Sequence, residues 1–325
     1  QQFARVKVPQ KNLPRFVAIP PGYSGSRPKP IHTAILQEQV IAFNLEMLFP
    51  GMSIEGHYFF RVTRDADLEL RDLEADDLML ALEQGLRKRR IGGEVVRLEV
   101  PNEMPKEVIE LLKSGLAIEQ DDVYVIDGPL GLDDLFGLTS LPLTTLKSKS
   151  HTGQTPAVME RSQQHLIEEG SIKIEEFESI FSVIRRGDIL LHHPYDLFST
   201  TVEEFINQAA DDPLVAGIKM TLYRTSKDSP IIAALIRAAE NGKQVMALVE
   251  LKARFDEDNN IQWAKQLERS GVHVVYGVLG LKTHTKIVLV VRKEAEKLRS
   301  YVHIGTGNYN SKTSKLYTDL GLLSA

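Results

Sequence analysis

The sequence predicts an α/β protein, and three observations point to that class. From about residue 165 onward, short apolar runs alternate with helical segments of about 12 residues, a rhythm typical of βαβ units. The preceding part has its own βαβα order. The composition is 42 % hydrophobic and 26 % charged, which is that of an ordinary globular protein with ample residues for a core. We therefore expect an α+β domain over residues 1–167 and an α/β domain over residues 168–325.

The first domain is predicted from short apolar segments separated by turn residues. The apolar run between Pro14 and Pro20 predicts one strand, and the apolar periodicity of residues 33–48 predicts a helix. The remaining elements are two strands, each followed by a helix, at 57–64, 75–90, 94–100 and 106–114. Residues 128–156, rich in leucine, glycine and proline and then in polar residues, are expected to lead into the second domain.

The second domain is predicted as strands alternating with helices. Strands are expected to end at His193 and to span 215–222, 244–251, 272–276, 283–291 and 300–304. Three helices are expected. The first begins with a capping box at 200–204, the second runs from Ser229-Pro230 to Asn241-Gly242, and the third spans 259–270. This alternation predicts parallel strands with helices on both faces of the sheet.

Charge, cysteine content and hydropathy exclude several classes of protein. With 39 Lys and Arg against 44 Asp and Glu, the net charge is −5, so the chain lacks the basic excess of a nucleic-acid-binding protein. The absence of cysteine excludes disulfides and thiolate chemistry, and it fits a reducing compartment; we expect the cytoplasm. No apolar run reaches the roughly 18 residues of a membrane span. The chain begins at Gln1 and ends just after an apolar stretch, so we expect a piece of a longer protein.

One histidine of the nine has a lysine two positions later, in His284-Thr285-Lys286. In a strand, residues i and i+2 point to the same face, so this spacing would present an imidazole and an ammonium group together. About twenty residues later, Gly305-Thr306-Gly307-Asn308 follows a predicted strand. Its glycines allow the backbone to approach a ligand, and its Thr and Asn side chains offer hydrogen bonds.

The His-x-Lys and Gly-Thr-x-Asn combination resembles one half of a phospholipase D-type active site. In that superfamily the histidine attacks phosphorus and forms a phosphohistidine, while the lysine and asparagine stabilise the phosphoryl oxygens. The aspartate that usually follows the lysine by five residues would fall at Val291 and is missing. This departure indicates a divergent branch.

The wider chain resembles the polyphosphate kinase family, the bacterial ATP-dependent type that works through a phosphohistidine. The motifs that carry this resemblance extend over nearly the whole chain. They are the segments 49–52, 60–65, 220–224, 251–257, 280–286 and 303–310. The resemblance implies reversible transfer of the γ-phosphate of ATP to inorganic polyphosphate, with Mg²⁺, ATP or ADP and polyphosphate as partners, and a homo-oligomer for the full-length protein.

The resemblance also assigns roles to single residues. His284 would be the phosphorylated nucleophile, with Lys286 and Asn308 as the other catalytic residues. Tyr317, Arg224, Arg254 and His303 would contact ATP or phosphate. The family places its magnesium site at the two arginines, but guanidinium is a permanent cation with no free lone pair, so Arg224 and Arg254 would grip phosphate oxygens that in turn hold the metal.

Alternatives stay open at this point. His303 could contact phosphate, or it could orient the Gly-rich turn. The protein could be a phospholipase D-like phosphodiesterase, or a non-catalytic module that binds polyphosphate or nucleotide. Because the resemblance implies two His-x-Lys halves and this chain holds one, we expect residues 1–325 to be inactive by themselves.

Overall fold

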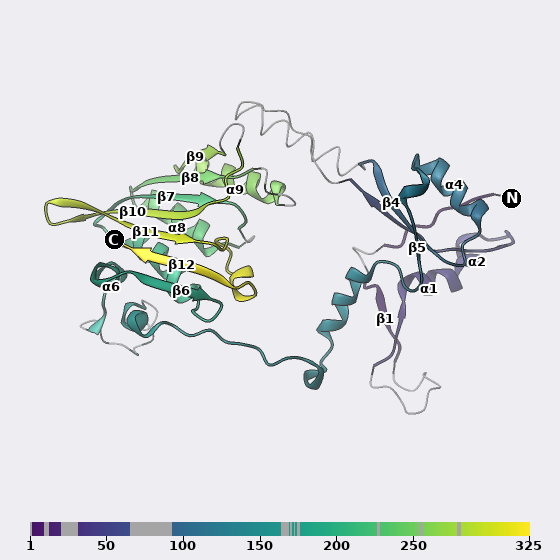
Figure 1. Cartoon of the computed structure of the whole chain (residues 1–325), viewed down its shortest axis with the longest axis horizontal. Coiled ribbons are helices and arrows are strands. Elements are labelled where there is room, and N and C mark those ends of the chain that lie inside the picture. The colour runs from purple at the N-terminus through teal and green to yellow at the C-terminus, as the bar shows by residue number, and fades with distance from the viewer. Residues whose placement is uncertain are drawn as a thin grey trace. The chain divides into compact units, whose positions relative to one another are not determined.

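The computed structural model describes residues 2–9, 13–20, 32–65, 93–163, 169, 171, 173, 176–225, 228–251, 253, 256–277 and 281–325. These residues form two compact units, one from residues up to 65 together with 93–148 and the other from residue 149 onward (Figure 1). Both units combine helices with sheets, which confirms the predicted α/β class. Among the described residues, no helix has both the length and the apolar character that crossing a bilayer requires.

The first unit contains a three-stranded sheet of order β3-β4-β5 and a two-stranded ladder. Its elements are β1 (Phe16–Ala18), β2 (Ala34–Leu36), α1 (Gln37–Phe43), α2 (Leu45–Leu48), β3 (Arg61–Arg64), β4 (Val95–Pro101), α4 (Lys106–Leu116) and β5 (Val123–Ile126). Short 3-10 helices follow at Gln120–Asp122, Leu132–Ser140 and Thr144–Leu146. Leu98, Val100 and Leu112 bury the side of α4 that faces the sheet.

The predictions for the first unit were right for β1, β4 and α4 and wrong in three places. Residues 33–48 begin with a short strand, β2, before α1 and α2, because Ala34–Leu36 pairs with β1. Strand β3 starts at Arg61 instead of residue 57. Strand β5 was missed. It lies parallel to β4, and that pairing is a tertiary contact that cannot be predicted from the four residues of β5. The helix predicted at 75–90 lies outside the described residues.

The second unit is built on a seven-stranded mixed sheet of order β6-β12-β11-β10-β7-β8-β9 (Figure 1). Its strands are β6 (Ile189–His193), β7 (Val215–Leu222), β8 (Gln244–Val249), β9 (His273–Tyr276), β10 (Lys286–Glu294), β11 (Lys297–Gly305) and β12 (Asp319–Ser324). Only β7, β8 and β9 run parallel to one another, and the other neighbours pair antiparallel. The expectation of an all-parallel arrangement is therefore wrong, because β10 and β11 form a hairpin.

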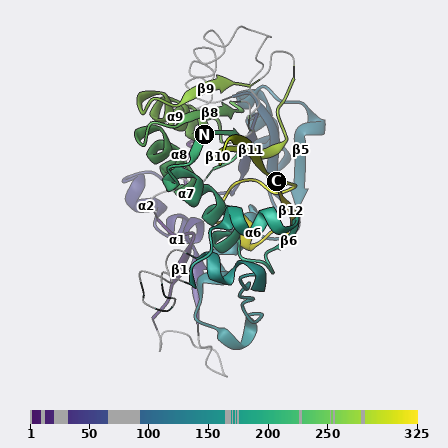
Figure 2. The same ribbon diagram turned by 90° about the vertical axis from the view of Figure 1, so that its left-hand side faces the viewer.

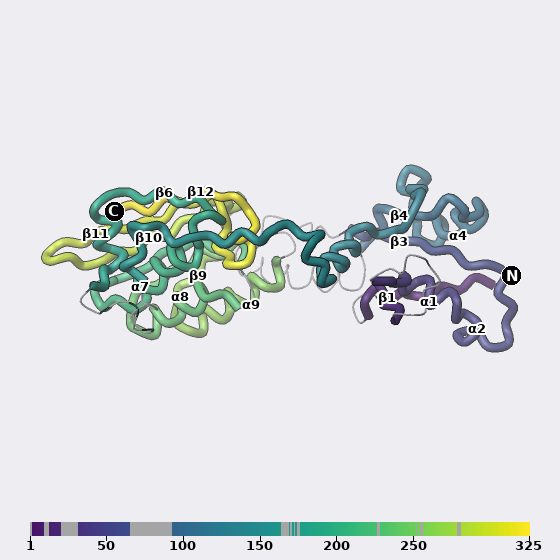
Figure 3. The backbone as a smooth tube through the Cα atoms, turned by 90° about the horizontal axis from the view of Figure 1, so that it is seen from below, coloured from purple at the N-terminus to yellow at the C-terminus, as the bar shows by residue number. Residues whose placement is uncertain are grey.

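The helices of this unit are α6 (Ile180–Arg186), α7 (Glu204–Asp211), α8 (Pro230–Glu240) and α9 (Glu257–Arg269), with 3-10 helices at Ala157–Ser162 and Thr313–Lys315. Figures 2 and 3 show α7, α8 and α9 side by side on one face of the sheet, and neighbouring pairs are in contact. The expectation of helices on both faces is wrong for the described residues. The strands β7, β8 and β9 lie next to one another in the sheet in the order in which they occur in the chain. Successive right-handed crossovers between them therefore place their helices on the same side of the sheet.

The helix starts were predicted with mixed success. Ser229 caps α8 by accepting a hydrogen bond from the Ile232 N–H, as its Ser-Pro pattern predicts. The capping box expected at 200–204 is wrong: a π-helical turn, Ser199–Glu203, leads into α7 instead. There the Thr201 hydroxyl donates to the Leu197 carbonyl, so it does not cap a helix N-terminus. Helix α6 and strand β12 were not predicted.

The core of the second unit lies between the sheet and its helices. Even-numbered residues of β7 and β10, namely Ile218, Met220, Leu222, Val288 and Val290, face this core and are almost fully buried. Lys286 has the same parity as Val288 and is also buried. The alternation of side chains in β10 thus brings a lysine to the end of the core-facing row.

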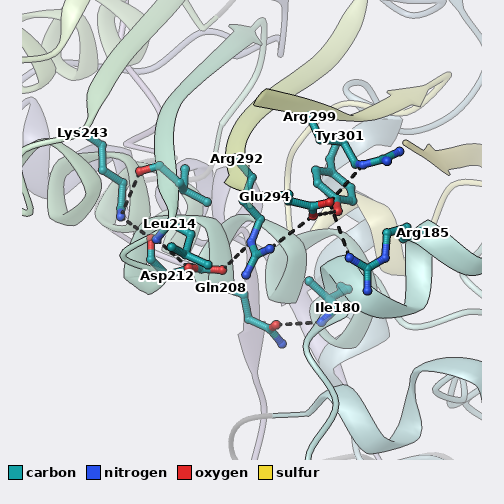
Figure 4. A network of polar contacts seen from close by, with 11 residues as sticks. Ile180, Arg185, Gln208, Asp212, Leu214, Lys243, Arg292, Glu294, Arg299 and Tyr301 are labelled. Carbon is teal, nitrogen blue, oxygen red and sulfur yellow. Dashed lines mark hydrogen bonds and ion pairs between the residues drawn. The ribbon is translucent and has the colours of Figure 1, made fainter. Parts of the chain in front are cut away.

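A polar network holds the opposite end of the β10–β11 hairpin (Figure 4). The Glu294 carboxylate accepts hydrogen bonds from the Tyr301 hydroxyl and from Arg292, at 3.2 Å for the arginine. Arg299 and Arg185 lie on its second oxygen at 3.0 and 3.5 Å. Because Glu294 and Arg292 are largely buried, these charges stabilise the hairpin only as a paired set.

Candidate functional site

Strand directions bring the candidate residues to one edge of the seven-stranded sheet. The carboxyl ends of β7 and β8 lie there, and β10 begins there because it runs antiparallel to β7. Lys286 at the start of β10 pairs with Gly305 at the end of β11, so the Gly-Thr-Gly-Asn turn belongs to the same edge. Asp319 opens β12 two positions before Gly321, which pairs with Gly305. This edge is where ligands bind in open α/β sheets.

His284 lies in the segment just before β10, and its side chain is exposed. Its ring packs edge-on against Tyr223, with ring centroids 5.1 Å apart and an angle of 81° between the planes. Strand β10 starts three residues later than predicted, so His284 and Lys286 do not share a strand face. The nucleophile candidate is exposed, whereas Lys286 is buried.

Lys286 is 4 % exposed, and its ammonium group donates to the carbonyl of His284. Burial lowers the pKa of this amine; the negative charge of Asp319 opposes the shift, and the positive charge of Arg224 adds to it. The ammonium nitrogen also lies 5.3 Å from the centroid of the Tyr223 ring, whose π face attracts a cation.

Arg224 follows Tyr223 directly after β7 and forms an ion pair with Asp256 at 3.0 Å. The side chains of Arg224 and Asp256 are 42 % and 35 % exposed, so both charges are partly open to solvent. Burial raises the pKa of Asp256, and the positive charge of Arg224 opposes that shift. Tyr223 lies within the motif of residues 220–224 but was not predicted as a site residue, although its position between a predicted strand end and Arg224 was a signal for that role.

His303 lies on the core-facing side of β11, beneath the Gly-rich turn. Its Nδ1 is hydrogen bonded to the Tyr309 hydroxyl at 2.8 Å. The ring covers Gly305 and Gly321, where an added Cβ would come within 2.9 and 2.6 Å of ring atoms, so glycine is required at both positions. Burial, helped by the positive charge of the nearby His193, lowers the pKa of His303 to about 3, so this imidazole is neutral at pH 7.

Asn308 turns its Oδ1 inward, and within the described part of the chain that atom has no hydrogen-bond partner. Asn308 and His303 line a small cavity under the turn, together with His193, Ser314 and Asp319. Asp319, which sequence reasoning missed, accepts a hydrogen bond from the Thr306 hydroxyl at 2.8 Å. Its carboxylate would collide with any Cβ at Gly307, at 2.5 Å, which explains the second glycine of the turn.

No described contact joins Tyr317 to His284. Tyr317 follows the 3-10 helix Thr313–Lys315, and its side chain is 64 % exposed. Arg254 lies outside the described residues. Among the residues that are described, no cluster of three or more His, Asp and Glu side chains has the arrangement of a metal site.

Comparisons with known proteins agree on one family. The family model of the polyphosphate kinase middle domain matches residues 1–138, and that of the polyphosphate kinase C-terminal domain 1 matches residues 179–325. Proteins named polyphosphate kinase from Parasynechococcus marenigrum and Synechocystis sp. are 85 % and 57 % identical to the chain, over 100 % and 99 % of its length. A crystal structure of the polyphosphate kinase from Porphyromonas gingivalis is 29 % identical and covers 98 % of the chain with a TM-score of 0.70.

The fold and the site together define an α/β protein whose sheet edge gathers a histidine and cationic side chains. The chain belongs to the polyphosphate kinase family. It spans about half the length of the relatives it matches, namely 46 % and 44 % of the two curated proteins and 42 % of the crystallised chain.

Proposed function

We propose that the protein containing this chain transfers the γ-phosphate of ATP to the end of inorganic polyphosphate, through a phosphohistidine on His284. The observation that carries this proposal is the exposed His284 imidazole at a sheet edge, with Lys286 and Arg224 close by. Membership of the polyphosphate kinase family supports the substrates.

In the first step, a nitrogen lone pair of His284 attacks the γ-phosphorus. A P–N bond forms, the bond from the γ-phosphorus to the β,γ-bridging oxygen breaks, and ADP leaves with that electron pair. In the second step, a terminal oxygen of polyphosphate attacks the phosphorus and the P–N bond breaks, which restores the imidazole. Both steps run in reverse with ADP as acceptor.

Charge neutralisation and positioning supply most of the catalysis in phosphoryl transfer. Lys286 and Arg224 provide cations at the same sheet edge, and the Tyr223 ring lies against both, with the Arg224 guanidinium carbon 5.6 Å from the ring centroid. Arg224 can exchange its partly exposed partner Asp256 for a phosphate, which a guanidinium binds through two parallel hydrogen bonds. We include Asn308, Tyr317, Arg254 and His303 in the proposed site on the family resemblance.

Magnesium is expected to arrive as part of the nucleotide substrate. Mg²⁺ requires oxygen ligands, and the guanidinium of Arg224 has no lone pair to offer. Within the described residues no metal cluster exists. The phosphate oxygens would therefore hold the ion, and its charge would neutralise them while Arg224 binds the remaining oxygens.

The proposal is tested by detecting the phosphohistidine intermediate. The full-length protein, incubated with γ-labelled ATP, is expected to acquire acid-labile, alkali-stable label. His284→Ala is expected to abolish the label, and Lys286→Ala to slow its appearance. His273→Ala, which removes an exposed histidine of β9, is the matched control and should label normally. Label that persists in His284→Ala would contradict the proposal. Phosphodiester hydrolysis without any labelled protein would favour a phosphodiesterase.

A further inference from the structure

The backbone around His284, which lies just before β10, is held by side chains that come from the ends of other strands. Residues 281–285 lie before β10 and have no regular structure apart from an isolated bridge at Leu281. A nucleophile needs a fixed direction of attack, and irregular backbone does not provide one without supporting contacts. Two side chains, from the ends of β8 and β7, make those contacts on the two sides of His284.

Glu250 holds the residue before His284. It follows β8, is 2 % exposed, and accepts a hydrogen bond from the Thr283 N–H on its Oε2 at 2.7 Å. Its own backbone is fixed on both sides: its N–H donates to the Leu222 carbonyl at 2.9 Å, and its carbonyl accepts from the Asn260 amide at 2.9 Å. The carboxylate is therefore anchored to the core before it meets Thr283.

The buried Asn260 of α9 ties this anchor to the aromatic wall of the site. Its amide nitrogen also donates to the Tyr223 carbonyl at 2.8 Å, and Tyr223 is the ring against which His284 packs. One amide thus joins the chain segments that follow β7 and β8.

Thr221 holds the residues after His284. Its hydroxyl donates to the Thr285 carbonyl at 2.8 Å and accepts from the Ile287 N–H at 3.0 Å. The ladder between β7 and β10 pairs Met220 with Val288 and goes no further toward the site. Where that ladder ends, the Thr221 hydroxyl supplies the hydrogen bonds to the backbone of Thr285 and Ile287.

We infer that Thr221 and Glu250 are positioning residues for the nucleophile. Together they fix the backbone at residues 283, 285 and 287, so that His284 presents its imidazole in one direction beside Tyr223. Neither residue needs to touch the substrate. This inference rests on the proposed function, because it assumes that His284 is the group that is phosphorylated.

The main test compares Thr221→Val with Thr221→Ser in the full-length protein. Valine keeps the shape and removes the hydroxyl, whereas serine keeps the hydroxyl. Single-turnover labelling over a range of ATP concentrations separates the maximal rate of phosphohistidine formation from the half-saturating concentration of ATP. We expect Thr221→Val to lower the maximal rate by about ten- to a hundredfold, the scale of a nucleophile displaced by an ångström. The half-saturating concentration should change little, and Thr221→Ser should label at nearly the wild-type rate.

Glu250 supplies a second arm, so the inference does not depend on the folding of one variant. Glu250→Gln keeps an oxygen that can accept from Thr283 and is expected to retain most of the rate, whereas Glu250→Ala is expected to lose it with ATP binding intact. Thr139→Val is the matched control, because the Thr139 hydroxyl also donates to a carbonyl, that of Phe136, in the first unit.

The outcomes separate the two proposals. If wild-type protein labels and Thr221→Val labels at the same maximal rate, the positioning role is wrong while the proposed function stands. A change confined to the half-saturating ATP concentration would also overturn the positioning role, and so would Glu250→Gln losing as much as Glu250→Ala. If the wild-type protein acquires no label, the proposed function itself fails.

Discussion

At the scale of single residues, Arg224 is the cation whose replacement is most informative. Its ion pair with Asp256 is partly exposed to solvent, so we expect it to add little to stability, and the proposed role lies in phosphate binding. We expect Arg224→Ala to raise the ATP and Mg²⁺ requirement and to lower turnover by roughly 2–4 kcal/mol of transition-state stabilisation. Arg224→Lys should be nearly as harmful, since lysine cannot bind an oxygen pair in parallel. Steady-state kinetics of the full-length protein measure both.

Arg237 is the matched control for Arg224. It forms a comparable ion pair with Asp211, at 2.7 Å and with side chains 40 % and 41 % exposed. Arg237→Ala should leave the kinetics unchanged. Wild-type kinetics for Arg224→Ala would remove Arg224 from the site, and wild-type kinetics for Arg224→Lys would reduce its role to that of a point charge.

At the scale of secondary-structure elements, helix α4 ends on a residue with a strained backbone. Ala117 has φ 55° and ψ 50°, the left-handed region in which glycine has no steric penalty. Relief of that strain exceeds the extra chain entropy of glycine, so Ala117→Gly should stabilise the first unit by about 0.5–1 kcal/mol. Hydrogen exchange of the α4 amides in increasing urea measures this change.

The control for this prediction is Ala233→Gly, at the fourth residue of α8 and at an exposed helical position. That substitution should destabilise the second unit by about 1 kcal/mol, because glycine is a poor helix former. If Ala117→Gly is destabilising by a similar amount, the left-handed C-terminus of α4 is not the source of strain.

The β10–β11 hairpin predicts a dependence of stability on alkaline pH. Burial, together with the hydrogen bond and negative charge of Glu294, raises the pKa of Tyr301 from 10.0 to about 12. A pKa raised on folding adds stability that is complete below the unfolded pKa and is lost as the pH rises through the folded pKa. The free energy of unfolding of the second unit should therefore fall between pH 10 and 12.

Urea unfolding of wild type and Tyr301→Phe over this range measures that loss. The phenylalanine variant should show a flatter alkaline profile, although its hairpin lacks one hydrogen bond to Glu294. An identical slope in the two proteins would show that other groups cause the alkaline loss.

At the scale of the whole molecule, the site in this chain is expected to be one half of a larger one. The family resemblance implies two His-x-Lys halves, and His284 begins the single such motif in this sequence. General acid–base assistance typically contributes about 10²–10⁴-fold, and a second half would also bring phosphate contacts. We therefore predict that residues 1–325 fold but synthesise no measurable polyphosphate.

Assays of chain elongation with residues 1–325 beside the full-length protein check this prediction. Robust synthesis by the shorter chain would mean that one half suffices, or that two copies supply both halves. The domain boundary expected near residue 167 stays a prediction, and the two compact units divide between residues 148 and 149.

Local sequence patterns were sufficient for much of this protein. Ser-Pro and Asn-Gly signals bounded α8, the apolar runs marked β7 and β8, and His284 with Lys286 stood out by spacing and by family resemblance. These features depend on near neighbours in the chain, so a linear pattern contains them. Two of the missed elements, β5 and β12, are short and become strands by pairing with distant partners.

The amino-acid sequence alone established the α/β class, the family and the candidate nucleophile. Long-range packing established the rest: helices on one face of a mixed sheet, a buried Lys286 beside an exposed His284, and His303 held neutral beneath the turn. Asp319, Thr221 and Glu250 acquire their contacts from strands and loops that are 13 to 66 residues away. Such contacts depend on strand order and register. Both are set by the cooperative burial of the whole core, so they cannot be predicted from the sequence of any single segment.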